Sequence, residues 1–200
     1  METGAAVTTE EPSRPRILRW IVIGLVLAIL VATGTAAALV ARYQPLEHGS
    51  SGGTPSISLP FKDVDNPSEG TTTRVVTYIQ GATLDVDVSI RNDGPWGVTI
   101  ASVPRQNFGL FHVTEVRRGV LNNCCVATEP FAPFALSPGE DRLLRLHGVV
   151  SGCKNYATEG GVIFNSYPVR YRILGITRST WIESTHEIEI HIPKGYLCTE

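Results

Sequence analysis

The feature that most constrains this chain is an uninterrupted apolar run near its N-terminus. The 22 residues from Trp20 to Ala41 contain no charged side chain. As an α-helix rising about 1.5 Å per residue, the run would be about 33 Å long, which matches a hydrocarbon core of about 30 Å. It lacks the amphipathic pattern of a helix that buries one face in a soluble core. The sequence therefore predicts one transmembrane α-helix at 20–41.

Positive charges predict the orientation of this helix. Arg14, Arg16 and Arg19 precede the apolar run, whereas Arg42 alone follows it closely. Because Lys and Arg are retained on the cytoplasmic side, we expect residues 1–19 to form a cytoplasmic tail. Everything after Tyr43 is then exported. The predicted localisation is the cell membrane, with a single span and an extracytoplasmic C-terminal domain.

A cleaved signal peptide is the alternative interpretation of the N-terminal segment. The arginines, the apolar run and the small residues Thr35–Ala38 all fit such a peptide. The apolar run is longer than the usual apolar region of about 7–15 residues, and Leu39 and Val40 extend it past the small residues, which favours a signal anchor. Both interpretations export the domain that follows.

Composition divides the rest of the chain into a linker and a domain. Residues 42–70 carry four prolines and the glycine–serine cluster Gly49–Gly53, which predicts a flexible stalk. Within it, the alternation of Ile57, Leu59 and Phe61 is also consistent with a first edge strand. The remaining segment, residues 71–200, has about 130 residues, which is enough for one compact domain.

Beyond Thr71 the hydrophobic pattern has a period of two. Leu84, Val86, Val88 and Ile90 share one face of a predicted strand at 84–91, and Asp85, Asp87, Ser89 and Arg91 occupy the exposed outer face. Asp87→Asn on that outer face is therefore expected to be nearly neutral. Turn residues follow at 92–95 and recur at 137–140. We expect an all-β fold, an antiparallel β-sandwich of about seven strands. The other predicted strands are 74–79, 98–103, 108–116, 142–150, 169–174 and 186–192.

Charged residues predict how the last two strands pair. Arg170 and Arg172 share one face of the first strand, and Glu187 and Glu189 share one face of the second. An antiparallel hairpin with Arg172 opposite Glu187 would also place Arg170 opposite Glu189. We expect this charged ladder on the outer face to be structural, although a binding role is the alternative.

The β-rich run Leu84–Gly94 is followed later by the turn Leu136–Glu140, which precedes an apolar strand. In these features the chain resembles bacterial immunoglobulin-like or fibronectin-like domains. The resemblance covers about residues 71–192 and implies an immunoglobulin-like β-sandwich. Membrane-tethered versions of such domains are common in actinobacteria. The excess of Arg over Lys in this chain is typical of proteins from GC-rich bacterial genomes. These domains share no chemistry, so the resemblance implies no functional residue.

All four cysteines lie in the predicted exported domain, where disulfides are expected. The adjacent Cys124 and Cys125 lack the C-x2-C spacing typical of zinc sites. If strands alternate in direction, the strands that precede Cys153 and Cys198 end at the same pole of the sandwich. We therefore predict a Cys153–Cys198 disulfide. Cys124 and Cys125 are then left as a vicinal disulfide or as free thiols.

The leading functional hypothesis is a non-enzymatic protein-interaction module of the cell envelope. The sequence has no G-x-S-x-G, phosphate-loop or H-E-x-x-H motif, so it predicts no catalytic residue, cofactor or metal site. A net charge of −2 argues against nucleic acid as a partner. The candidate interaction surface comprises Trp96, Phe131 and Phe134, although these aromatics would also suit the ends of the core.

An exported copper- or zinc-binding protein, or an enzyme whose site forms only on folding, is the alternative hypothesis. It requires a concave pocket lined by several of His112, His147, Asp85, Asp87 and the cysteines. Met1 is the only methionine, so the thioether ligands that favour copper are missing.

Overall fold

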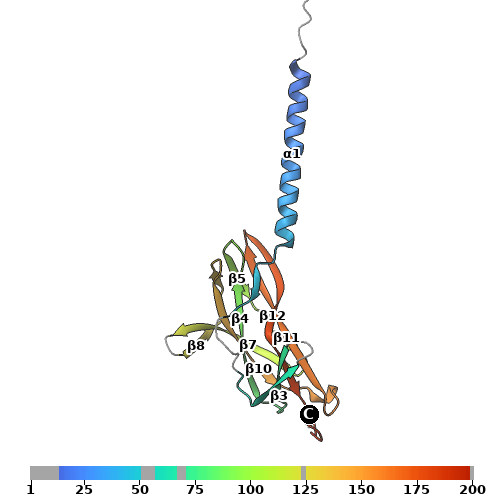
Figure 1. Ribbon diagram of the computed structural model, residues 1–200, viewed down its shortest axis with the longest axis vertical. Coiled ribbons are helices and arrows are strands. Elements are labelled where there is room, and N and C mark those ends of the chain that lie inside the picture. The colour runs from blue at the N-terminus through green and yellow to red at the C-terminus, as the bar shows by residue number, and fades with distance from the viewer. Residues whose placement is uncertain (1–13, 51–56, 67–70, 123–124, 199–200) are drawn as a thin grey trace, which may run out of the picture. The chain divides into compact units, whose positions relative to one another are not determined.

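The computed structural model describes residues 14–50, 57–66, 71–122 and 125–198. The chain divides into two compact units, of which the first ends at Tyr43 and the second begins at Gln44. The first unit contains the single long helix α1 (Arg14–Arg42), and the second is a β-domain (Figure 1). The window Leu18–Thr35 of α1 is long and apolar enough to cross a membrane, although a signal sequence near an N-terminus meets the same criteria.

The β-domain is a sandwich of two six-stranded sheets. The first sheet has the order β1-β4-β10-β7-β6, with β8 paired to β7, and the second has the order β2-β3-β12-β11-β5-β9. All pairs are antiparallel except β3–β12, which is parallel. The strands are β1 (Leu46–His48), β2 (Phe61–Asn66), β3 (Thr71–Thr77), β4 (Thr83–Asn92), β5 (Val98–Ser102), β6 (Asn107–Phe108), β7 (Phe111–Asn122), β8 (Cys125–Pro130), β9 (Phe134–Leu136), β10 (Asp141–Val150), β11 (Gly161–Ile173) and β12 (Ile176–His191).

The fold confirms the predicted immunoglobulin-like β-sandwich, with more strands than expected. Alternate residues of β4 face the core, and none of Leu84, Val86, Val88 and Ile90 is more than 4% exposed. The second sheet contributes buried side chains from β11 and β12, including Val169, Tyr171, Ile182, Ile188 and Ile190. A period of two therefore located the core face of β4, as expected for a strand with one buried side.

The predicted flexible stalk differs from the structure in its described parts. β1 pairs with the end of β4, and Ile57 bridges to Val86 further along the same strand. β2 pairs along its whole length with β3 in the other sheet. β1 and β2 thus each form an edge strand, one in each sheet. Proline- and glycine-rich composition indicated coil, but the open edges of β4 and β3 supply the ladder hydrogen bonds that such a segment lacks by itself.

The predicted register of the last hairpin is wrong. A tight turn at Leu174–Gly175 joins β11 to β12, so Arg170 lies opposite Ser179 and Arg172 opposite Thr177. An irregularity near Ser166 then shifts the pairing further along the two strands. The charged ladder does not form, because the turn begins β12 ten residues before the predicted strand. Glu187 instead accepts a hydrogen bond from the Thr73 hydroxyl at 3.0 Å.

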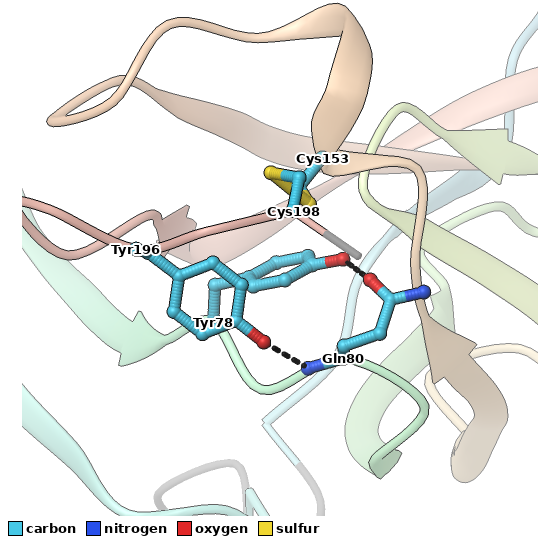
Figure 2. Close-up of a disulfide and its surroundings, with 5 residues drawn as sticks. All are labelled: Tyr78, Gln80, Cys153, Tyr196 and Cys198. Atoms are coloured by element: carbon cyan, nitrogen blue, oxygen red, sulfur yellow. Dashed lines mark hydrogen bonds between the residues drawn. A yellow bond between two sulfur atoms is a disulfide. The ribbon is translucent and has the colours of Figure 1, made fainter. Parts of the chain in front are cut away.

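One pole of the sandwich, here called the disulfide pole, is closed by the C-terminal segment. Cys153 and Cys198 form a disulfide with a Cα–Cα distance of 5.9 Å, which is the pairing expected from the strand directions. Beside it, the rings of Tyr78 and Tyr196 meet edge to face at 5.2 Å (Figure 2). The backbone N–H of Gln80 donates to the Tyr196 hydroxyl at 3.2 Å. Cys124 and the side chain of Cys125 lie outside the described residues.

The opposite pole, here called the N-terminal pole, consists of three segments: residues 44–46, the loop 93–97 and the turn 174–176. The Asp93 N–H donates to the Pro45 carbonyl at 2.8 Å, which ties the first segment to the loop. Asn92 is fully buried, and its side-chain amide donates to the carbonyls of Trp96 at 2.8 Å and Leu136 at 3.1 Å. This one side chain thus organises the loop between β4 and β5.

Candidate functional site

The three aromatics of the predicted interaction surface occupy different environments. Trp96 lies in the loop at the N-terminal pole and is 45% exposed. Phe134 is buried in β9, opposite Ile100 of β5, so it belongs to the core. Phe131 is half-buried between β8 and β9, and its ring meets that of Phe134 edge to face at 6.0 Å. The structure therefore does not gather the three side chains into one surface.

Phe131 lines a hollow of about 430 Å³, here called the hairpin hollow. Its walls come from the end of β5 and the residues after it, from the middle of β7, and from the end of β8 and the residue after it. The lining residues are Ser102, Val103, Arg105, Glu115, Val116, Pro130 and Phe131. Val103 and Val116 are each 7% exposed and form the apolar floor. The volume is within the usual range for binding sites, about 300–1,000 Å³.

Two opposite charges stand at the rim of the hairpin hollow. Glu115 forms an ion pair of 3.5 Å with Arg117 on the same strand. Arg105 is exposed, and the structure records no ion-pair partner for it among the described residues. An apolar floor with a cation and an anion at its edge suits a protein surface that presents an apolar side chain flanked by charges.

The β7–β8 hairpin that borders the hollow extends from the body of the sandwich (Figure 1). Its base is fastened by Arg118, which forms an ion pair of 2.9 Å with Glu129 across the hairpin. The guanidinium carbon of Arg118 also lies 6.0 Å from the centroid of the Phe134 ring. Arg118 thus joins the hairpin to the buried aromatic beneath Phe131.

The described residues of the alternative hypothesis do not converge on one pocket. His147 Nδ1 and Asp85 Oδ1 are 2.6 Å apart on neighbouring strands. Asp87 instead binds Arg145 through both carboxylate oxygens, at 2.6 and 2.8 Å. His112 lies opposite Val149, and Cys153 is in the disulfide. In the described part of the chain, no three His, Cys, Asp or Glu side chains lie close enough together to hold a metal ion.

Asp87 also differs from its predicted environment. The sequence placed it on an exposed outer face, whereas the structure leaves it 5% exposed. Arg145 of β10 lies directly opposite and covers the carboxylate, and its own side chain remains 24% exposed. This bidentate Arg–carboxylate pair links β4 to β10, the two central strands of the first sheet, in a defined geometry.

A second hollow of about 400 Å³ lies between β1 and β12. His48 and Trp181 are among its lining residues, on opposite sides. Burial lowers the pKa of His48, and the nearby charge of His186 lowers it further. Burial also lowers the pKa of His186, with Arg74 adding to the effect. Sequence patterns did not predict this site, because β1 was expected to be part of a stalk.

Comparisons with known proteins concern the fold alone. No protein-family profile and no curated protein sequence matches the chain. Among solved structures, it is similar to the ASH / PapD-like domain of human CEP192 (PapD-like domain 7), at 9% sequence identity and a TM-score of 0.29. The similarity covers 62% of this chain and 84% of that one. Similarity at this level assigns neither a partner nor an activity to this protein.

Sequence reasoning missed the polar part of the hairpin hollow. Arg105 and Glu115 are ten positions apart and belong to no motif, and only the packing of the two sheets brings them to one rim. Phe131 could be found from the sequence, because a large aromatic side chain between two prolines in a predicted loop is an unusual place for a core residue.

Proposed function

We propose that this protein is a membrane-anchored, non-enzymatic interaction module whose β-sandwich lies outside the cytoplasmic membrane. Residues 1–19 form the cytoplasmic tail, 20–41 span the membrane, and the rest is extracytoplasmic. Three arginines before the apolar run, against one directly after it, support this orientation. The Cys153–Cys198 disulfide also supports it, because disulfides persist in oxidising compartments.

We further propose that an envelope protein binds in the hairpin hollow. The observation that carries this proposal is the combination of a half-buried Phe131, an apolar floor and two opposite rim charges in one hollow. Aromatic and arginine side chains are enriched among residues that dominate binding energy at interfaces. The projecting β7–β8 hairpin gives a partner a second contact wall beside the hollow.

Site-specific photocrosslinking in cells tests the binding site. A photoreactive phenylalanine analogue at Phe131 should yield a discrete adduct with one partner protein. The same analogue at Phe61, an aromatic that is 43% exposed on the opposite edge of the second sheet, is the matched control and should not. Glu115→Arg should abolish the Phe131 adduct, because it leaves two like charges at the rim. Equal adducts at both positions, with the disulfide intact, would rule out the hairpin hollow as the partner site.

A reporter that is active only in the cytoplasm tests the orientation. Fused after Glu200, it should be silent. Neutral replacements of Arg14, Arg16 and Arg19 should raise its activity, since they remove the charges that retain the N-terminus. Activity in the unmodified chain would overturn the proposed topology.

A further inference from the structure

The N-terminal pole carries three exposed apolar side chains. Trp96 is 45% exposed, Leu174 is 58% exposed and Ile176 is 48% exposed. The pairing of Arg172 with Thr99 continues toward this pole, which brings the turn at Leu174 beside the Trp96 loop. Single exposed apolar residues are common on protein surfaces, but these three share one end of the domain.

Leu174 is an unusual residue for its turn. It has a φ of +49°, and Gly175 follows with a φ of +81°. A two-residue hairpin turn with two positive φ angles strongly favours Asn-Gly or Asp-Gly, because a branched apolar side chain is strained in the left-handed region. Leu174 is neither buried nor suited to the backbone there, so the fold itself does not account for it.

The link between the two units is short. α1 ends at Arg42 and β1 begins at Leu46, so only Tyr43, Gln44 and Pro45 join them. Four fully extended residue steps span at most about 14 Å. If α1 ends at the membrane–water interface, the start of β1 therefore lies within about 14 Å of that interface.

We propose that the N-terminal pole docks on the lipid headgroup region of the membrane that α1 spans. Trp96 occupies the interface, where an indole ring meets both apolar and polar surroundings, and Leu174 and Ile176 reach toward the acyl boundary. The exposed Arg172, two residues before the turn, faces anionic headgroups. This inference rests on the proposed membrane anchor.

Depth-dependent quenching of tryptophan fluorescence tests the docking. The chain has three tryptophans, Trp20, Trp96 and Trp181. Full-length variants that retain only one of them, with Phe at the other two positions, are placed in vesicles of phosphatidylcholine and phosphatidylglycerol. The vesicles contain a lipid brominated near the headgroup. A fourth variant carries Leu197→Trp in the background without native tryptophans and reports on the disulfide pole, where Leu197 is 83% exposed.

The Trp20 variant should be quenched, which reports that the helix is inserted. Docking predicts that Trp96 is quenched several-fold more than the Leu197→Trp reporter. Quenching of Trp20 together with equal, weak signals from Trp96 and the Leu197→Trp reporter would overturn the docking and leave the anchor standing. An unquenched Trp20 would overturn the anchor and the docking together. If the fluorescence of Trp96 changes with the density of protein in the vesicles and not with brominated lipid, the pole contacts a second copy of the chain. That result would also overturn the proposal.

Leu174→Asn separates docking from folding. Asn suits the left-handed turn position, so the thermal stability of this variant should be unchanged or higher. The quenching of Trp96 by brominated lipid should nevertheless fall in this variant, because one of the three apolar contacts with lipid is lost. Ile163→Asn, at a residue 57% exposed on β11 and remote from this pole, is the matched control and should leave the quenching of Trp96 unchanged. Unchanged quenching in Leu174→Asn would overturn the role of this turn.

Discussion

The two poles of the sandwich are closed in different ways. At the disulfide pole, a covalent bond joins Cys153 to Cys198, and Tyr78 packs against Tyr196. At the N-terminal pole, the described residues form no covalent cross-link. The buried Asn92 instead connects backbone segments that precede β5 and end β9. The described residues after β12 join no strand ladder and are fastened by the disulfide, whereas the segment that begins the domain is already held in the β1–β4 ladder.

A polar hub and a covalent bond respond to different perturbations. Asn92 stabilises its pole only while it is shielded from water. Its amide donates hydrogen bonds to backbone carbonyls that would otherwise be buried without a partner. The disulfide acts chiefly by restricting the unfolded chain and depends on redox conditions. The N-terminal pole should therefore be sensitive to substitution at one side chain, and the disulfide pole to reduction.

The largest expected effect comes from a substitution in the core that both poles share. Val88→Asp should lower the free energy of unfolding by about 5 kcal/mol or prevent folding, because it buries an unpaired carboxylate in a residue position that is 4% exposed. Urea unfolding of the full-length protein in detergent, followed by tryptophan fluorescence, measures this loss.

Asp87→Asn, on the adjacent position of β4, is the matched comparison. The sequence alone predicts it to be nearly neutral, but the structure makes Asp87 the bidentate partner of Arg145. We therefore expect a loss of about 1–2 kcal/mol, since an amide still accepts one of the two hydrogen bonds. A loss as large as that of Val88→Asp would mean that the two faces of β4 are assigned incorrectly.

Removal of the disulfide should have the next largest effect. The combined Cys153→Ala and Cys198→Ala variant should be less stable by up to about 4 kcal/mol, the chain-entropy value for a bridge between positions 45 apart. A reductant should have a similar effect on the wild-type protein and none on the variant, in the same urea titration. If the wild-type midpoint resists reduction, the Tyr78–Tyr196 contact, and not the disulfide, closes this pole.

Asn92→Ala should weaken the N-terminal pole by about 2 kcal/mol, because it leaves two backbone carbonyls without their donor. Asn107→Ala, at an exposed asparagine in β6, is the matched control and should change stability little. Equal stability of the two variants would show that water replaces the Asn92 amide, and the contrast between the poles would then be smaller than the structure indicates.

The smallest effect concerns pH and the seam between β1 and β12. Burial lowers the pKa of both His48 and His186, while Asp141 and the Glu183 backbone oppose this at His48, and Asp63 opposes it at His186. The unfolded chain therefore binds protons at a higher pH than the folded chain does. Stability should be constant above the ordinary histidine pKa of 6.5 and fall as the pH drops below it.

Thermal melting between neutral and mildly acidic pH measures this slope. His48→Gln and His186→Gln should each make the melting temperature less dependent on pH, and the double variant least dependent. A slope that survives in the double variant would place the responsible group elsewhere in the domain.

Local patterns in the sequence determined the parts of this protein that depend on local chemistry. The uncharged length of 20–41 predicted a long apolar helix, and the alternation along 84–91 predicted the core face of β4. The direction of the strands before Cys153 and Cys198 was enough to bring the two cysteines together. Each of these features is set by residues within a few positions of one another, or by counting reversals of direction.

Only the tertiary structure decided which segments became neighbours. β1 and β2 lack a strong sequence pattern of their own and form strands because the edges of β4 and β3 were open. The turn at Leu174–Gly175 set the register of β11 and β12, against the charge pattern. The separation of Trp96 from Phe131 also depends on which sheets pack together. Ladder register and sheet order are long-range properties, whereas alternation records only whether a residue faces inward.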